Sequence, residues 1–359
     1  MSIFHRLTIS DIVRETDDAI SVAFDVPETL ADDYQYVQGQ HLTLKTDVDG
    51  EEIRRSYSIC SAVGDNQLKV AIKQIDGGVF STFANSNLAK GQALDVMVPQ
   101  GRFFTPLSPD HKKNYLLVAA GSGITPIFSI LKTILQTEPD SQVTLIYGNR
   151  TVSTILFLEP LEDLKNTYPD RLNMIHILSR EEQDTDLFNG RIDRAKCERL
   201  FNEALNATGF DDVFLCGPEQ MIMDVKDFLV EKGLPRENIH FELFITDAAI
   251  AATRKAAEDI HSNDAGPNHS VTVILDGQKT EVAIPEEGVS ILDAALEMGV
   301  DLPFACKGGV CCTCRAKIVQ GNVRMDLNYA LDDDEVSEGF VLTCQSHPLT
   351  DDVIVDFDA

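Results

Sequence analysis

Four cysteines near the C-terminus have a spacing that suits an iron–sulfur cluster. Cys306, Cys311 and Cys314 follow a C-x4-C-x2-C pattern, and Cys344 comes after 29 intervening residues. Four thiolates can hold two irons, with one loop around the cluster and a distant cysteine that completes the ligand set. Gly308, inside a Lys-Gly-Gly stretch of that loop, allows backbone N–H groups to approach sulfide closely. The spacing therefore predicts a [2Fe–2S] site with these four cysteines as ligands.

Structural zinc is the alternative for these cysteines, because four thiolates also suit a tetrahedral metal. Zinc ligands usually come as two C-x2–4-C pairs, whereas here three cysteines crowd one loop and the fourth is distant. We therefore expect iron, with zinc as the minor alternative. Cys312 lies beside Cys311 but off the ligand register, so we expect it to be packed or weakly hydrogen-bonded and not a ligand.

Arg55-x-Tyr57-Ser58 forms a second candidate site, and it resembles the R-x-Y-S/T flavin motif of the ferredoxin–NADP⁺ reductase superfamily. An arginine can bind a pyrophosphate through two N–H groups, a tyrosine can stack on the isoalloxazine, and a serine can hydrogen-bond the flavin N5 edge. Standing alone, this tetrapeptide is ordinary strand content. Arg54 precedes Arg55, so which arginine reaches the phosphate stays open.

A glycine turn follows at the distance where this superfamily has its second flavin segment. Gly77-Gly78 precedes Ser81 and Thr82. The segment resembles a turn that enters a helix N-terminus, where backbone N–H groups and hydroxyls can hold phosphate. The two motifs together predict FAD binding, with Gly78, Ser81 and Thr82 as contacts in this second segment.

Residues 121–126 (Gly-Ser-Gly-Ile-Thr-Pro) form a third motif, directly after an apolar strand. A glycine-rich turn from strand to helix lets a pyrophosphate reach the helix N-terminus. We expect Gly121 and Gly123 to bind the nucleotide, Thr125 to act as helix N-cap, and Pro126 to occupy the first helical position. This pattern departs from G-x-G-x-x-G but matches the nucleotide loop of the superfamily.

The ends of two later strands carry further residues of the resemblance. Cys216-Gly217-Pro218 matches the segment that lies near the nicotinamide in these enzymes, although a strand end and turn would look the same. Glu242 and Phe244 stand where relatives place a carboxylate and an aromatic ring beside the flavin. The resemblance implies an electron relay through cofactors with no catalytic side chain, Cys216 lying near the nicotinamide and the motif serine near the flavin.

Two arginines favour NADPH over NADH. Arg150 follows the second expected strand of the nucleotide domain, without the Asp or Glu that would bind an adenine-ribose hydroxyl, and Arg180 follows the third. Arginine suits a 2′-phosphate. Either arginine is about as well explained as a surface charge, so NADH remains the less favoured alternative.

The elements that must position these residues change character along the chain. Residues 1–107 alternate apolar and polar positions between Gly- and Pro-bearing turns, which predicts an antiparallel β-barrel for the flavin. Residues 108–245 alternate short apolar strands with helical stretches, which predicts an α/β domain with a parallel sheet. Residues 246–269 are interpreted as a linker, and 270–359 as an α+β, β-grasp-like ferredoxin domain. The fold class is therefore multidomain.

Charge and composition limit the partners. The net charge of −28 disfavours nucleic acid and anionic membrane surfaces. Residues 270–359 contain 5 Lys+Arg and 17 Asp+Glu, so this acidic part favours a basic partner protein, although a solvated surface explains any single carboxylate equally well. No run of 18 apolar residues and no signal-peptide pattern occurs, so we expect a cytoplasmic protein.

The domain order resembles that of reductase components of bacterial oxygenases. Within that group, the chain is similar end to end to the family of reductase subunits of ring-1,2-phenylacetyl-CoA epoxidases, notably at 39–45, 121–126, 144–151, 305–311 and 352–359. This implies electron flow from NADPH to FAD, then to [2Fe–2S], then to a di-iron oxygenase. Two alternatives remain: a reductase for a Rieske oxygenase or another hydroxylase, and a non-catalytic zinc-knuckle interaction domain fused to a degenerate nucleotide-binding module.

Overall fold

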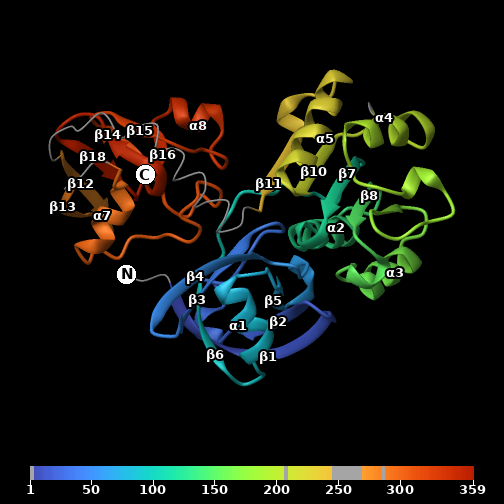
Figure 1. Ribbon diagram of the computed structural model, residues 1–359, viewed down its shortest axis with the longest axis horizontal. Coiled ribbons are helices and arrows are strands. Elements are labelled where there is room, and N and C mark those ends of the chain that lie inside the picture. The colour runs from blue at the N-terminus through green and yellow to red at the C-terminus, as the bar shows by residue number, and fades with distance from the viewer. Residues whose placement is uncertain (1–3, 206–208, 245–268, 285–287) are drawn as a thin grey trace. The chain divides into compact units, whose positions relative to one another are not determined.

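Alternation of apolar and polar residues builds an N-terminal sheet with an almost fully buried inner face. The computed structural model describes residues 4–205, 209–244, 269–284 and 288–359, so the predicted linker at 246–269 lies outside the described residues except for its last position. Six strands lie in the order β4-β3-β6-β1-β2-β5 (Figure 1). Their bounds are β1 Phe4–Thr16, β2 Ala19–Asp25, β3 His41–Val48, β4 Glu51–Ser58, β5 Leu68–Lys73 and β6 Ala93–Met97.

The two edges of this sheet meet, which closes it into a barrel. Ile59, just after β4, forms an antiparallel bridge with Val70 of β5, although β4 and β5 are the two edge strands. Closure of this kind removes exposed strand edges. Helix α1 (Val79–Asn87) packs Phe80 and Ala84 into the barrel core. The predicted antiparallel barrel is confirmed.

A five-stranded parallel sheet follows, in the order β11-β10-β7-β8-β9. Its strands are buried runs, as expected for a sheet that helices cover. The strands are β7 Asn114–Ala120, β8 Gln142–Asn149, β9 Leu172–Leu178, β10 Asp212–Gly217 and β11 Ile239–Leu243. The helices are α2 Ile124–Thr137, α3 Leu158–Thr167, α4 Arg194–Glu203 and α5 Glu219–Glu231. The predicted α/β domain with a parallel sheet is confirmed.

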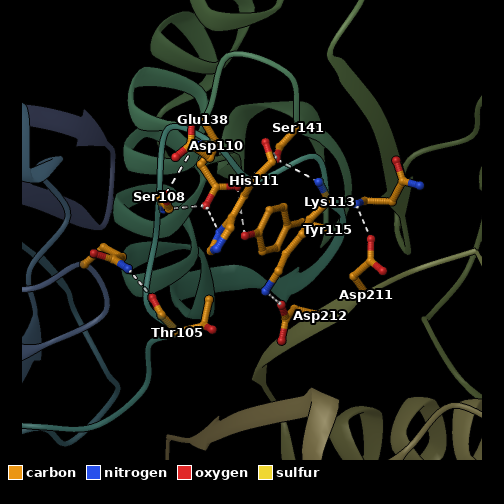
Figure 2. Close-up of polar contacts among 12 residues, drawn as sticks. Thr105, Ser108, Asp110, His111, Lys113, Tyr115, Glu138, Ser141, Asp211 and Asp212 are labelled. Atoms are coloured by element: carbon orange, nitrogen blue, oxygen red, sulfur yellow. Dashed lines mark hydrogen bonds and ion pairs between the residues drawn. The ribbon is translucent and has the colours of Figure 1, made fainter.

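A buried carboxylate after α2 binds the segment that leads from the barrel to this sheet (Figure 2). Glu138, at the end of α2, accepts hydrogen bonds from the Ser108 N–H, the Tyr115 hydroxyl and the Ser141 hydroxyl, at 3.1, 3.0 and 2.7 Å. The His111 Nδ1 lies 2.7 Å from the same carboxylate. Burial by itself would raise the pKa of Glu138, but these hydrogen bonds more than offset it and lower the pKa.

The C-terminal domain has its own core and belongs to a second compact unit. Its main sheet has the order β13-β12-β18-β14-β16, and β15 pairs with β17. Asp276 and Gly277, both with positive φ, form the two-residue turn of a hairpin in this sheet. The elements are β12 His269–Leu275, β13 Gln278–Ile284, α7 Ile291–Glu297, β14 Arg315–Gln320, β15 Val323–Met325, α8 Asp333–Ser337, β16 Phe340–Leu342, β17 Ser346–Pro348 and β18 Val353–Asp356.

None of the helices in the described ranges has both the length and the apolar character needed to cross a membrane. Helix α7 begins after Ser290, whose hydroxyl accepts the Asp293 N–H at 3.1 Å as N-cap. Ile291 and Leu292 then enter the domain core. This helix packs against the segment that carries the last of the four candidate cluster cysteines.

Candidate functional site

The four candidate cluster cysteines lie in two pairs. The thiols of Cys306 and Cys311 interact directly, and so do those of Cys314 and Cys344. Thr343 joins the second pair, because its hydroxyl and its N–H both donate to the Cys314 carbonyl, at 2.9 and 3.1 Å. The distant cysteine therefore returns to the loop through the end of β16, as the spacing required.

Two thiol pairs fit a two-iron cluster, in which each iron takes two protein ligands, better than one tetrahedral zinc ion. Among the described residues, no three His, Cys, Asp or Glu side chains gather as a single metal site. The Gly308 N–H points at the Cys306 sulfur, with 3.3 Å between nitrogen and sulfur. The hydrogen bond with Cys311 lowers the pKa of Cys306 to about 6, against the effect of burial. The donor set therefore fits [2Fe–2S] chemistry.

Close backbone packing explains why residue 309 is a glycine and where the Cys312 thiol lies. A Cβ at Gly309 (φ +75°) would lie 2.9 Å from the Leu327 carbonyl oxygen, and the Tyr329 N–H donates to the Gly309 carbonyl at 3.0 Å. The Cys312 thiol donates to the Ala330 carbonyl at 3.0 Å. Cys312 is thus hydrogen-bonded to residues 326–330, the segment that covers the loop. This is the situation expected for a cysteine outside the ligand register.

The two flavin motifs meet in the barrel. Tyr57 on β4 is half-buried, and its ring lies 5.6 Å from that of Phe80, in the first turn of α1. This contact brings the tyrosine to the helix N-terminus that was expected to hold phosphate. Arg55 is also half-buried on β4, and its Nη1 donates to the Arg54 carbonyl at 2.7 Å.

The phosphate segment has the predicted form, but its two hydroxyls differ in role. Gly78 is the N-cap of α1. The buried Ser81 hydroxyl accepts the Ile75 N–H at 3.1 Å and donates to the Gly78 carbonyl at 3.3 Å, so it shapes the turn. The Thr82 hydroxyl is exposed and accepts from Gln74 at 3.5 Å. The turn therefore presents backbone N–H groups at a helix start, which suits a phosphate.

The nucleotide loop corrects two sequence expectations. Helix α2 begins at Ile124 with Gly123 as N-cap, so Thr125 and Pro126 take the second and third helical positions. The predicted roles of Thr125 as N-cap and of Pro126 at the first helical position were both wrong, because residues 121–123 form a 3₁₀ turn that continues into the helix. The Thr125 hydroxyl instead donates to the carbonyl three residues earlier at 3.1 Å.

Glycines let this loop touch the neighbouring strand. A Cβ at Gly123 would lie 2.2 Å from the Cys216 carbonyl oxygen. A Cβ at Gly217 (φ +156°) would lie 3.2 Å from the Ala120 nitrogen. Pro218 then serves as N-cap residue of α5. The glycine loop and the Cys-Gly-Pro segment thus form one surface at the carboxyl ends of β7 and β10, where a nucleotide binds in parallel sheets.

Tyr147 is a part of this site that the sequence reasoning missed. It is fully buried in β8, and its hydroxyl donates to the Gly121 carbonyl at 3.0 Å, which fixes the start of the glycine loop. Burial raises its pKa well above the ordinary value. A buried tyrosine usually has a partner for its hydroxyl, and a tyrosine at the end of an apolar strand was the available signal.

The barrel and the parallel sheet share a polar contact. The Ser58 hydroxyl, at the end of β4, lies 3.4 Å from Glu242 Oε2 on β11. Glu242 pairs in register with Cys216 on β10, and burial raises the pKa of Glu242 to about 7. Burial, with the nearby carboxylate, also raises the pKa of Cys216 well above its ordinary value. Phe244 is exposed two residues beyond Glu242.

The two arginines expected at a 2′-phosphate come together. The Arg180 N–H donates to the Arg150 carbonyl at 2.8 Å, which extends the pairing of β8 and β9 beyond their ends. Both side chains are exposed. Two guanidinium groups on adjacent strand ends can bind one phosphate together.

Three family models match the chain in the order of its sheets. Residues 6–105 match the oxidoreductase FAD-binding domain, and residues 117–227 match the oxidoreductase NAD-binding domain. Residues 273–349 match the 2Fe-2S iron-sulfur cluster binding domain. The matches agree with the cofactor types that the three groups of residues suit.

Whole-length relatives belong to oxygenase systems. A subunit of the 1,2-phenylacetyl-CoA epoxidase from Escherichia coli (strain K12) is 46% identical over 359 residues, which cover 100% of this chain and 99% of the relative. The ferredoxin reductase component of 3-ketosteroid-9-alpha-monooxygenase from Rhodococcus rhodochrous is 34% identical, covering 98% and 96%. The solved structure of phthalate dioxygenase reductase shares the fold, with a TM-score of 0.58 and 22% identity over 99% of this chain and 100% of that one.

Proposed function

Because this chain belongs to the ferredoxin–NADP⁺ reductase superfamily, we propose that it supplies single electrons from NADPH to a di-iron oxygenase that epoxidises phenylacetyl-CoA. Within the superfamily it is one of the reductase components with FAD-binding, NAD-binding and C-terminal [2Fe–2S] domains. The observation that carries the choice of acceptor is the 46% identity to the epoxidase relative over its full length. When bound, the flavin accepts a hydride and releases its electrons singly, and the cluster carries one electron at a time.

The residues of the barrel bind and orient the flavin in this proposal. Tyr57 supplies a ring face, and Arg55 or Arg54 supplies a cation for the pyrophosphate. The turn at Gly78 presents helix N–H groups, with Ser81 holding the turn and Thr82 offering an exposed hydroxyl. In this role, these groups position the cofactor and do not react.

Ser58 and Glu242 can bind and release a proton beside the flavin. The Ser58 hydroxyl is oriented toward Glu242 Oε2, and a carboxyl group with a pKa of about 7 can hold or release a proton near neutral pH. Cys216 stays a neutral thiol in this environment, since burial raises its pKa. Its place beside the glycine loop suits contact with the nicotinamide, and the exposed Phe244 ring suits contact with the flavin.

The remaining residues bind the nucleotide and complete the exit for electrons. Gly121 and Gly123 provide the close approach for the pyrophosphate, Thr125 stabilises the first turn of α2, and Gly217 and Pro218 shape the opposite wall. Arg150 and Arg180 supply the preference for NADPH over NADH.

The cluster lies in the acidic C-terminal domain, where it is held by Cys306, Cys311, Cys314 and Cys344. The acidic character of this domain suits a basic oxygenase surface. We further propose a cytoplasmic location, where NADPH is supplied and thiols stay reduced.

Reconstitution tests this proposal. The purified chain, with iron, sulfide and flavin measured, is mixed with the di-iron epoxidase, phenylacetyl-CoA, O₂ and NADPH, and epoxide formation is followed. We expect NADPH-dependent product, which is lost when this chain is omitted. A second candidate, a reductase for another oxygenase, is supported by the 3-ketosteroid monooxygenase relatives. Bound flavin and cluster with no epoxide, but with electron transfer to a Rieske component, would favour that candidate. Zinc without visible absorption bands would exclude both.

A further inference from the structure

The side chain directly after the fourth candidate ligand points back at the cluster loop. Gln345 is 3% exposed, and its Nε2 lies 2.9 Å from the Lys307 carbonyl oxygen. The same nitrogen lies 3.0 Å from the carbonyl oxygen and 3.7 Å from the Sγ of Cys344. An amide has two N–H donors, so here they are distributed over three acceptors on both sides of the candidate site.

We propose that Gln345 is a positioning residue of the [2Fe–2S] site. One N–H of its amide holds the start of the cysteine loop at Lys307, and the other is shared between the carbonyl and the sulfur of Cys344. This inference rests on the proposed cluster site, because it needs Cys344 to be an iron ligand.

The Lys307 end of this bridge explains an unusual backbone conformation. Lys307 follows Cys306 and has φ +51°, a left-handed conformation that residues with a Cβ rarely adopt. Such a conformation persists only where its surroundings hold it. Its carbonyl accepts the Gln345 amide, and its ammonium group pairs with Asp293 at 2.7 Å. Gln345 therefore holds the peptide group that orients the Gly308 N–H toward the Cys306 sulfur.

The backbone and stem of Gln345 add two further contacts. Its carbonyl accepts the Asp326 N–H at 2.9 Å, which anchors the segment that covers the loop. A Cβ at Gly309 would lie 3.3 Å from Gln345 Cγ, so the stem occupies the space that this glycine leaves open. The side chain of Gln345 thus contacts the loop and the distant ligand, and its backbone carbonyl holds the covering segment.

The Cys344 end of the bridge has an electrostatic consequence. An N–H aimed at a ligand sulfur stabilises the more negative, reduced state of an iron–sulfur cluster, and hydrogen bonds of this kind set its reduction potential. Removal of the Gln345 amide is therefore expected to lower the potential and to loosen the loop. If Gln345 only filled space, its replacement by a side chain of similar length without donors would change neither the reduction potential nor the position of the Lys307 peptide group.

The test uses the full-length holoprotein with Gln345→Met and Gln345→Glu. Methionine keeps the length without donors, and glutamate replaces the amide nitrogen with an acceptor that repels both carbonyls and the sulfur. Ser346→Ala is the matched control, because it removes a buried hydrogen bond to the Leu342 carbonyl (2.8 Å) beside the site. The measurements are the cluster reduction potential by dye-mediated titration and the rate of iron release to a chelator. Iron, sulfide and flavin contents are measured first.

We expect both Gln345 variants to show a lower potential and an iron release at least about tenfold faster than the parent, in line with the usual effect of outer-shell substitutions at metal sites. The shift should be larger for glutamate, and Ser346→Ala should match the parent. If both Gln345 variants load a cluster with unchanged potential and release rate, the inference is wrong. Loss of the cluster during purification supports it when Ser346→Ala keeps the cluster, and contradicts it when the control loses the cluster too. Absence of iron and sulfide from the parent would instead refute the proposed function.

Discussion

Ser58 Oγ lies 3.4 Å from Glu242 Oε2, although 184 positions separate the two residues in the chain. One belongs to the barrel and the other to the parallel sheet, so the contact joins the predicted flavin motif to the predicted nucleotide domain. Burial raises the pKa of Glu242 to about 7, so the carboxyl group is poised to change its protonation state at neutral pH.

Glu242→Gln should change the pH dependence of stability. Because the folded-state pKa is raised, the folded protein binds more protons than the unfolded chain between about pH 4.5 and 7, and the free energy of unfolding falls as the pH rises through this window. Glutamine does not ionise, so the variant should gain about 1–3 kcal/mol relative to the parent at pH 8 and little at pH 5. Denaturant unfolding at both pH values measures this. The exposed Glu159→Gln should show no such difference, and equal curves for Glu242→Gln and the parent would contradict the raised pKa.

Cys344→Ser should separate the two halves of the electron path. Loss of one of the four proposed ligands should reduce electron output to one-electron acceptors to background, while flavin reduction by NADPH stays within about twofold of the parent. Stopped-flow flavin absorbance and cytochrome c reduction measure the two activities. Cys312→Ser is the matched control and should keep the cluster, because the Cys312 thiol contacts the Ala330 carbonyl. Loss of both activities in Cys344→Ser would argue against separate domains for the two cofactors.

Arg150→Ala and Arg180→Ala should each weaken the preference for NADPH. Each removes a guanidinium group from the pair at the ends of β8 and β9, so kcat/KM for NADPH should fall about tenfold or more while that for NADH changes little. Arg236→Ala is the control, since Arg236 is exposed just before β11, at the opposite edge of the same sheet. An unchanged ratio of the two kcat/KM values in both strand-end variants would remove the 2′-phosphate assignment.

Glu138→Gln should destabilise the barrel-to-sheet segment in a pH-dependent way. The pKa of Glu138 is lowered, so its contribution to stability is present above its ordinary pKa and is lost as the pH falls through the lower folded-state value. The variant should lose about 1–3 kcal/mol at pH 7 and show a flatter acid limb. Thermal unfolding from pH 3 to 7 measures this. Asp140→Asn removes an exposed carboxylate that pairs with Lys112 at 2.7 Å, and should leave both quantities near the parent values.

The sequence predicted the cofactor chemistry and the local structure wherever these depend on residues close together in the chain. The cysteine spacing predicted a [2Fe–2S] domain because a loop of three close thiolates has few other uses. The barrel and the parallel sheet followed from periodicity and turn residues, which are properties of short segments. The N-cap at Thr125 was misjudged, because a glycine pair can extend a helix backward by one 3₁₀ turn, and no side-chain signal marks that choice.

Contacts between distant segments required the tertiary structure. The pairing of thiols into two sets, the Ser58–Glu242 contact, the Tyr147 hydroxyl on the Gly121 carbonyl and the amide of Gln345 on Lys307 all join residues that no local pattern connects. By itself, the sequence determined which cofactor chemistry the chain can support, since that depends on residue types and spacing. Only the fold decided which buried donor meets which acceptor, because that depends on how strands and loops pack together.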